Sequence, residues 1–152
     1  APMIVLHKHG DVIFELGGGD GEPSARLLVA SNILTMVSPV FRAMFTGGFA
    51  EGQDLSPSLP RVVPLPDDNK KAMELLCRIL HFDTNAIPAE LDMDSLVELT
   101  ILCDKYDCAT PFRFYGNVWV SALLPQACEK GFEELLSVTY GLDLPEPFME
   151  LT

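Results

Sequence analysis

Short apolar runs separated by turn-forming residues occupy the first third of the chain, and this pattern predicts β-strands. Three runs are rich in β-branched and aromatic residues: residues 3–7, 11–16 and 25–29. Only Lys8, His9 and Gly10 separate the first run from the second, a spacing that favours a β-hairpin. A further short strand is expected at residues 61–65, RVVPL.

Helical periodicity begins where the third predicted strand ends. Ser31 or Asn32 is suited to cap a short helix that runs to Val37. Ser38 followed by Pro39 predicts the start of another helix, because proline fits the first helical position. In that second helix four apolar positions share a face that we expect to be buried: Val40, Phe41, Met44 and Phe45.

Two longer amphipathic helices are predicted in the middle of the chain. The first follows Asp67 and Asp68, which are expected to cap it. Its expected buried stripe is Ala72, Leu76, Ile79 and Leu80. The second helix begins near Asp94, and its expected buried stripe is Leu96, Leu99, Thr100, Cys103 and Tyr106. From residue 112 onward the pattern stays helical, so strands followed by helices predict an α+β domain.

The composition is that of a single globular domain. The 152 residues are 48% hydrophobic, which is enough for a core without disulfides or a metal. Ten basic residues against 22 acidic ones give a formal net charge of -12, which repels phosphate, so no nucleic-acid partner is expected. The apolar runs are shorter than the roughly 20 residues of a membrane span, so we expect no membrane partner and an intracellular location. The chain stops within a helical pattern, which is typical of a piece of a longer protein.

No catalytic or metal-binding set emerges from the polar residues. His7, His9 and His81 lack the spacing of metal ligands, so neither a metal nor a cofactor is expected. The glycines of residues 17–21 follow a predicted strand, but no Gly-Lys-Ser/Thr follows them and the acidic residues among them would repel a phosphate. We interpret that segment as a turn.

The cysteines are predicted to be buried, reduced thiols. There are four of them: Cys77, Cys103, Cys108 and Cys128. Cys103 and Cys108 flank two aspartates, which would raise a thiol pKa, and residues five positions apart on a helix do not share a face. Core packing is therefore the expected role of the thiols, and we predict that the domain is not an enzyme.

Four segments, taken in order, resemble a BTB/POZ domain in the version common among fungal proteins. They are LLVASNILTMVSPVFRAMF, GFAEG, VVPLPDDNKKAMELLCRILHF and LTILCDKYDC. The resemblance covers residues 3–110 closely, and residues 111–152 are similar to the helical extension that follows this core in the fungal group. It implies an α+β fold in which helical hairpins are capped on one side by a short mixed sheet.

The resemblance also implies a function in protein association. Members of the family form homodimers and act as adaptors for cullin-based ubiquitin ligases, so an adaptor that self-associates or docks a cullin is expected. A homo-oligomerisation domain with no ligase role is the alternative. A third hypothesis is an enzyme or ligand-binding domain that uses the groove between the core and the C-terminal helices. A short helix cannot bury its whole apolar run on one side, so a self-association surface is expected at Ile33, Leu34 and Val37, beside Met36.

A candidate partner-binding site follows the second predicted helix. In cullin-binding members a hydrophobic-x-Glu triplet stands after the helix that carries the Ser-Pro-x-Phe element, and Phe49 and Glu51 match that triplet. The match implies that Phe49 is an aromatic anchor and that Glu51 orients the partner through a charge-assisted bond. The alternative is that Phe49 packs back on its own core as a contact at the helix end.

One position departs from the transcription-factor subgroup of the family. In that subgroup an aspartate is paired with a cation, whereas this chain has Ala30 and Ser31 where the cation is expected. An unpaired buried carboxylate is costly, so Asp11 is expected to reach the surface or a backbone donor.

Overall fold

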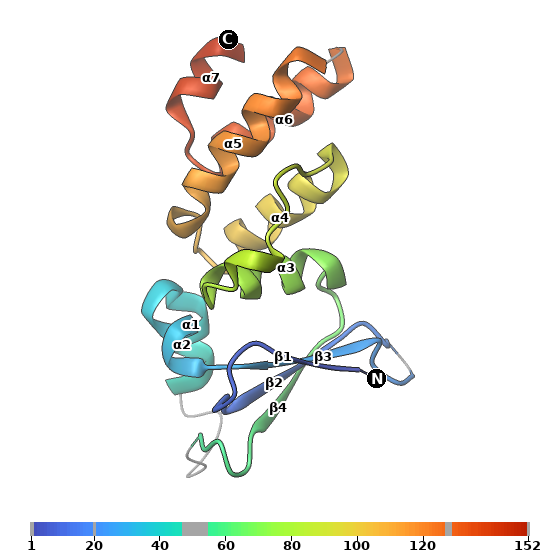
Figure 1. The fold of residues 1–152 in the computed structure, drawn as a ribbon, viewed down its shortest axis with the longest axis vertical. Coiled ribbons are helices and arrows are strands. Elements are labelled where there is room, and N and C mark those ends of the chain that lie inside the picture. Colours follow the sequence, from blue (N-terminus) through green and yellow to red (C-terminus); the bar gives the residue numbers. More distant parts are fainter. Residues whose placement is uncertain (1, 20, 47–54, 127–128, 152) are drawn as a thin grey trace.

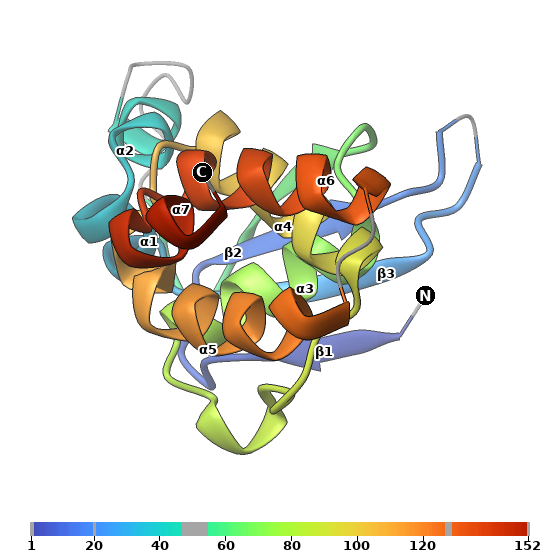
Figure 2. The ribbon, with the colours of Figure 1, turned by 90° about the horizontal axis from the view of Figure 1, so that it is seen from above.

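The computed structural model describes residues 2–19, 21–46, 55–126 and 129–151, and the chain has a mixed α and β fold in layers (Figure 1). The strands are β1 (Met3–Val5), β2 (Val12–Leu16), β3 (Ala25–Val29) and β4 (Arg61–Leu65). The α-helices are α1 (Ser31–Val37), α2 (Pro39–Thr46), α3 (Lys70–Leu80), α4 (Met93–Lys105), α5 (Arg113–Leu123), α6 (Glu129–Gly141) and α7 (Pro145–Leu151). Short 3-10 turns cover Thr84–Ala86, Thr110–Phe112 and Leu124–Gln126. The sheet forms one end of the molecule and α5, α6 and α7 form the other, with α3 and α4 between them (Figures 1 and 2).

The predicted hairpin between the first two strands is wrong, because the sheet order is β1-β3-β2-β4. Strand β1 pairs in parallel with β3, β2 pairs with β3 in the antiparallel sense, and β4 pairs in parallel with β2. The connection from β1 to β2 passes the end of β3, where a Cβ on Gly10 would lie 2.8 Å from the Val29 carbonyl oxygen. The short spacing correctly indicated a reversal of chain direction, but it carries no information on a third strand lying between the other two.

The two central strands bury one face of the sheet completely. Their inward residues are Val12, Phe14, Leu16, Ala25, Leu27 and Val29. The residues between them are half-buried, as the period of two along a strand requires. The strands predicted at residues 11–16 and 25–29 therefore form, the first of them from Val12 onward.

An aromatic cluster links this sheet to the helices. The Phe14 ring centroid lies 5.6 Å from that of Phe41 and 6.3 Å from that of Phe45. On its other side Phe41 stacks on Tyr106 of the α4 end, with centroids 4.3 Å apart. Stacked rings at these distances add to the free energy of burying the side chains. The cluster therefore joins β2, α2 and α4 in one core.

Helix α2 begins at the predicted Ser-Pro step. The Phe41 backbone N–H donates to Ser38 Oγ at 3.0 Å, and the Ser38 hydroxyl donates to the Tyr106 carbonyl oxygen at 2.6 Å. Phe41 and Phe45 are buried as predicted and Met44 is half-buried. Val40 was assigned to the same face but is 36% exposed, because it lies at the edge of the apolar stripe.

Both middle helices bury the stripes that their sequences predict, but the cap of α3 differs. The α3 stripe and the α4 stripe are buried at every position named from the sequence. Asn69, not an aspartate, caps α3: its Oδ1 accepts from the Ala72 backbone N–H at 3.0 Å. Asp68 is instead buried, where it pairs with Lys105 and accepts a hydrogen bond from the Tyr106 hydroxyl. The capping prediction for Asp67 and Asp68 is therefore wrong.

Helices α5, α6 and α7 continue the same core. Helix α6 packs against α4 and against α7, and the buried cluster extends from the sheet to Leu151. Trp119 of α5 is buried, and its Nε1–H donates to the Pro88 carbonyl oxygen at 3.0 Å. None of the helices in the described ranges has the length and apolarity to cross a membrane.

Within the described ranges, three helices end in a left-handed residue that is not glycine. These residues are Phe82 after α3, Asp107 after α4 and Asp143 after α6, with φ of 58°, 51° and 55°. After α3 the Phe82 N–H donates to the Ile79 carbonyl oxygen at 3.1 Å and the Asp83 N–H donates to that of Arg78 at 2.9 Å. This is the Schellman pattern of helix termination. Aspartate tolerates the left-handed region better than a bulky side chain does.

We expect Phe82→Gly to stabilise the protein by about 0.5 to 1 kcal/mol, because glycine removes the Cβ strain of the left-handed region. The Phe82 side chain is 81% exposed, so its removal sacrifices little burial. Urea unfolding measures the change. Phe82→Ala is the matched control, since it deletes the ring but keeps Cβ, and it should give no gain. A loss of stability in the glycine variant would show that the ring makes a favourable contact.

Candidate protein-interaction surface

The outward side of the α1–α2 hairpin is the first candidate surface. It consists of the exposed side chains on the two helices, here called the hairpin face: Asn32, Met36, Pro39, Val40, Arg42, Ala43 and Thr46. Met36 is 76% exposed and Val40 is 36% exposed, so two apolar side chains lie among polar and small ones. Exposed large apolar side chains are found in interfaces with other proteins, which makes this face a candidate interaction surface.

The residues predicted for self-association differ in their exposure to solvent. Leu34 is fully buried and belongs to the core of the single chain. Ile33 and Val37 are half-buried and pack against that core. Within this apolar run Met36 is the residue that points to solvent. The short helix thus turns most of the run inward and leaves one large apolar side chain outside.

A carboxylate from β2's N-terminal end holds the start of α1. Asp11 Oδ1 accepts from the Ser31 backbone N–H at 2.8 Å, and Oδ2 accepts from the Ser31 hydroxyl at 2.6 Å. The expectation that Asp11 finds a backbone donor is confirmed. A negative charge at a helix N-terminus also interacts favourably with the helix dipole. The N-cap residue itself is Ala30, so the prediction of Ser31 or Asn32 as the cap is wrong, and Asp11 supplies the bond from elsewhere in the chain.

His81, at the end of α3, holds the same region from the other side. Its Nε2 accepts from the Ala30 backbone N–H at 3.0 Å, so Nδ1 carries the proton and donates to the Cys77 carbonyl oxygen at 2.8 Å. Burial lowers the pKa of His81, and nearby His7 lowers it further against the effect of the Cys77 bond. The neutral ring therefore connects α3 to the residue that starts α1, which positions the hairpin face.

We expect the free energy of unfolding to fall as the pH drops below about 6.5, the ordinary pKa of histidine, and to keep falling until the lower native pKa of His81 is passed. In this window the unfolded chain binds the proton, whereas the folded chain must break the bond to Ala30 N–H to do so. Urea unfolding at a series of pH values measures the slope. His81→Gln does not titrate and should flatten the slope, and an unchanged slope would assign the pH dependence to other groups.

The predicted partner residues Phe49 and Glu51 lie outside the described residues. Helix α2 ends at Thr46, so the segment that carries them follows the hairpin directly along the chain. Their assignment depends on the sequence pattern alone.

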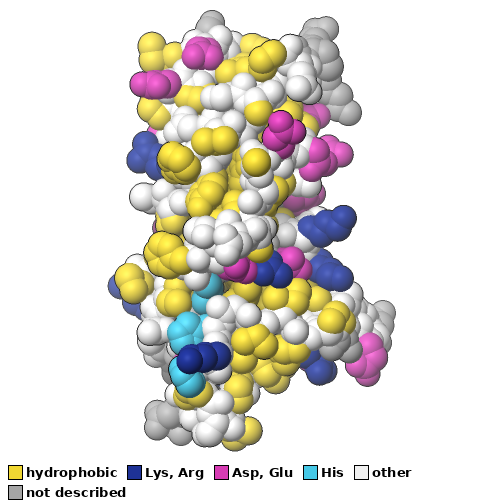
Figure 3. All heavy atoms as spheres, in the orientation of Figure 1, with side chains coloured by type: hydrophobic (Ala, Val, Ile, Leu, Met, Phe, Trp, Pro, Cys, Tyr) yellow, Lys and Arg dark blue, Asp and Glu magenta, His cyan; other side chains and the backbone are white. Residues whose placement is uncertain are grey.

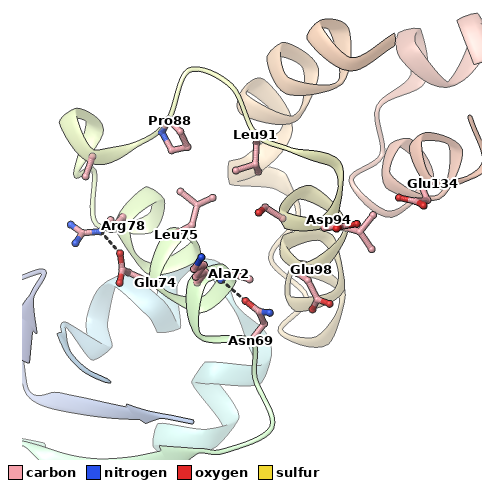
Figure 4. A pocket seen from close by; sticks show the side chains of 14 residues that line it. Asn69, Ala72, Glu74, Leu75, Arg78, Pro88, Leu91, Asp94, Glu98 and Glu134 are labelled. Atoms are coloured by element: carbon pink, nitrogen blue, oxygen red, sulfur yellow. Dashed lines mark hydrogen bonds and ion pairs between the residues drawn. The ribbon is translucent and has the colours of Figure 1, made fainter. Parts of the chain in front are cut away.

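A second candidate surface is a groove along α3, the connection after it, α4, the end of α5 and α6. Figure 4 shows the hollow that lies beside α3. The groove consists of two adjoining hollows of about 700 and 720 Å³, which share Leu91, Asp94 and Glu134. We call it the acidic groove, and the residues that matter are Leu75, Leu91, Val97, Glu90, Asp92, Asp94, Glu98 and Glu134. The sequence had indicated a groove between the core and the C-terminal helices as a third hypothesis, without naming its residues. The carboxylates of this groove come from segments that are far apart in the chain, so no sequence pattern indicated that they would lie close together.

The described thiols are buried and poorly suited to chemistry. Cys77, Cys103 and Cys108 are free and buried. Burial raises the pKa of Cys77, and a hydrogen bond that the Cys103 thiol donates to Cys108, together with burial, raises the pKa of Cys103. Cys103 and Cys108 do meet, contrary to the prediction for a continuous helix, because the left-handed Asp107 turns the chain back and the Cys108 N–H donates to the Cys103 carbonyl oxygen. In the ranges that the structure covers, no group of three His, Cys, Asp or Glu side chains is arranged to hold a metal ion.

No protein-family model matches this chain, and no curated protein matches it. The fold is a mixed α and β domain, and in its described part the candidate surfaces are the hairpin face and the acidic groove. In the view of Figure 3 most acidic side chains lie over the helical half of the molecule, the histidines lie toward the sheet end, and apolar side chains are visible over both halves.

Proposed function

We propose that this chain is a protein-interaction domain of the BTB/POZ type, an adaptor that self-associates or docks a cullin-type ubiquitin ligase scaffold. The observation that carries the proposal is that Met36 and Val40 are exposed apolar side chains on the helical hairpin, which precedes the Phe49 and Glu51 segment in the sequence. The overall arrangement supports it, since a short mixed sheet covers one end of helices that pack as pairs, α1 on α2 and α3 on α4. That is the arrangement which the resemblance implies.

The proposal gives the domain no catalytic role. The thiols at Cys77 and Cys103 have raised pKa values and are buried, so they are poor nucleophiles. His81 uses both ring nitrogens on backbone groups, which leaves neither for a substrate. These groups act as structural parts of the fold that support the hairpin face.

We expect Phe49→Ala to leave the melting temperature unchanged and to weaken binding to a cullin N-terminal region by about 2 kcal/mol or more, as loss of an aromatic hot spot does. Isothermal titration and thermal melting measure the two quantities. Phe114→Ala is the matched control, because Phe114 is a 73% exposed phenylalanine on α5. Met36→Asp should also weaken binding without unfolding, since Met36 is 76% exposed. If Phe49→Ala lowers the melting temperature and no cullin binds, Phe49 is a contact at the helix end and the adaptor role is excluded.

The alternative function, a homo-oligomerisation domain without a ligase role, is separated by the same variants. Light scattering gives the molecular mass of the domain alone and of any complex that it forms with the cullin region. A homodimer that Met36→Asp dissociates, together with no cullin complex, favours oligomerisation. A stable complex with the cullin region favours the adaptor.

A further inference from the structure

The acidic groove has an apolar floor that the chain leaves half-covered. Leu75 of α3, Leu91 of the connection and Val97 of α4 line it and are each half-buried. Figure 4 shows Leu75 and Leu91 projecting into the space between α3 and the connection. Covering such surface contributes roughly 25 cal/mol per Å² of apolar area removed from water. The floor therefore offers a partner more than electrostatic attraction.

The groove also carries carboxylates that no described side chain neutralises. Among the described side chains, none forms an ion pair or hydrogen bond with the carboxylates at the rim, which are Glu90, Asp92, Asp94, Glu98 and Glu134. The lining cations in the described ranges are Lys71 and Arg78, and Arg78 already pairs with Glu74 and Asp83. Like charges around one hollow repel each other, and an occupant that carries cations removes that repulsion.

We infer that the acidic groove binds a basic amphipathic segment of a partner protein. The apolar side chains of the segment lie on the floor formed by Leu75, Leu91 and Val97, and its Lys and Arg side chains face the rim carboxylates. Charge complementarity selects this occupant over an acidic or neutral segment of equal apolarity. Each hollow has the volume of a pocket that holds a few side chains.

The groove is a binding site distinct from the one proposed for a cullin. It shares no residue with the hairpin face. A variant at Met36 should therefore leave groove binding intact, and a variant in the groove should leave cullin binding intact. The two proposals can fail independently of each other.

The test uses a fluorescent peptide of about 18 residues, five helical turns, with Leu along one face and Lys on the others. One comparison peptide has the same composition in scrambled order, and a second has Glu in place of Lys. Fluorescence anisotropy gives the affinities, and amide chemical shifts in NMR locate the bound peptide. We expect the basic amphipathic peptide to bind about tenfold or more tightly than the scrambled one, to shift the amides of Leu75 and Leu91, and to bind less tightly as salt rises.

Matched variants separate the groove from the net charge. The double variant with Glu98→Lys and Glu134→Lys should weaken peptide binding about tenfold or more, since it reverses two rim charges. The double variant with Glu146→Lys and Glu150→Lys changes the net charge equally on α7, outside the groove, and should change binding less than about threefold. Where the charge reversals unfold the protein, Glu98→Gln with Glu134→Gln replaces them and should still weaken binding severalfold.

Four outcomes overturn the inference. One is that the amphipathic and scrambled peptides bind with equal affinity. Another is that the groove variant and the α7 variant weaken peptide binding equally. Either result would show that the peptide is attracted by net charge alone. The third is no binding of the basic amphipathic peptide. Leu75→Ser tests the floor separately, because it leaves every charge in place, and unchanged affinity in that variant also contradicts the inference.

Discussion

Phe41→Ala should destabilise the domain by about 3 to 5 kcal/mol, the cost of truncating a core aromatic side chain. Phe41 is fully buried between Phe14, Phe45 and Tyr106, so its removal opens a cavity at the junction of the sheet, α2 and α4. Chemical denaturation followed by circular dichroism measures the loss. The helix cannot shift to fill the cavity easily, since Ser38 ties its first turn to the Tyr106 carbonyl oxygen.

Two variants calibrate this result. Phe41→Leu keeps most of the apolar volume and should cost clearly less than the alanine variant. Phe114→Ala removes a phenylalanine that is 73% exposed and should change stability by less than about 0.5 kcal/mol. A Phe41→Ala protein that unfolds at the same denaturant concentration as the parent would place Phe41 outside the core and refute the packing of α2.

Asp68→Ala should destabilise the domain by about 2 to 3 kcal/mol, because it leaves the buried Tyr106 hydroxyl without its acceptor. The Asp68 side chain is 2% exposed, whereas that of its other partner Lys105 is 50% exposed and can return to water. Burial, and then the hydrogen bond to Asp68, raises the pKa of Tyr106, so the hydroxyl stays protonated and needs an acceptor. Denaturant unfolding measures the change.

Neighbouring residues supply the control for this second prediction. Asp67→Ala removes an exposed carboxylate one position away and should cost less than about 0.5 kcal/mol. Tyr106→Phe removes only the hydroxyl, and combining it with Asp68→Ala should give less than the sum of the single losses, since the two groups share one bond. Equal losses for the Asp67 and Asp68 variants would contradict the buried role of Asp68.

Several elements could be predicted because their signals are local. The strands at residues 11–16 and 25–29 are short runs of apolar, β-branched and aromatic residues, and the stripes of α3 and α4 repeat at helical spacing. The Ser38-Pro39 step is another local signal, since a capping hydroxyl and a proline act within one helical turn. Local periodicity depends on neighbours within a few residues, which the sequence states directly.

Other features depend on residues that are far apart in the chain. Whether Asp11 or Ser31 would cap α1, and whether Asp68 would cap α3 or enter the core, is decided by which groups meet after folding. The same holds for the hairpin face. The sequence shows an apolar run at residues 33–37, but only the packed structure shows that Leu34 is buried and Met36 is exposed.

By itself, then, the sequence determined the kinds and positions of most helices and strands, the burial of their apolar stripes and the strongly acidic character of the chain. The tertiary structure alone decided the order of strands in the sheet, the partners of the buried polar groups and the meeting of distant carboxylates around the acidic groove. The physical reason is that periodicity arises from backbone geometry within one element, whereas strand order, ion pairs and grooves arise from contacts between elements, whose free energies depend on the whole packed arrangement.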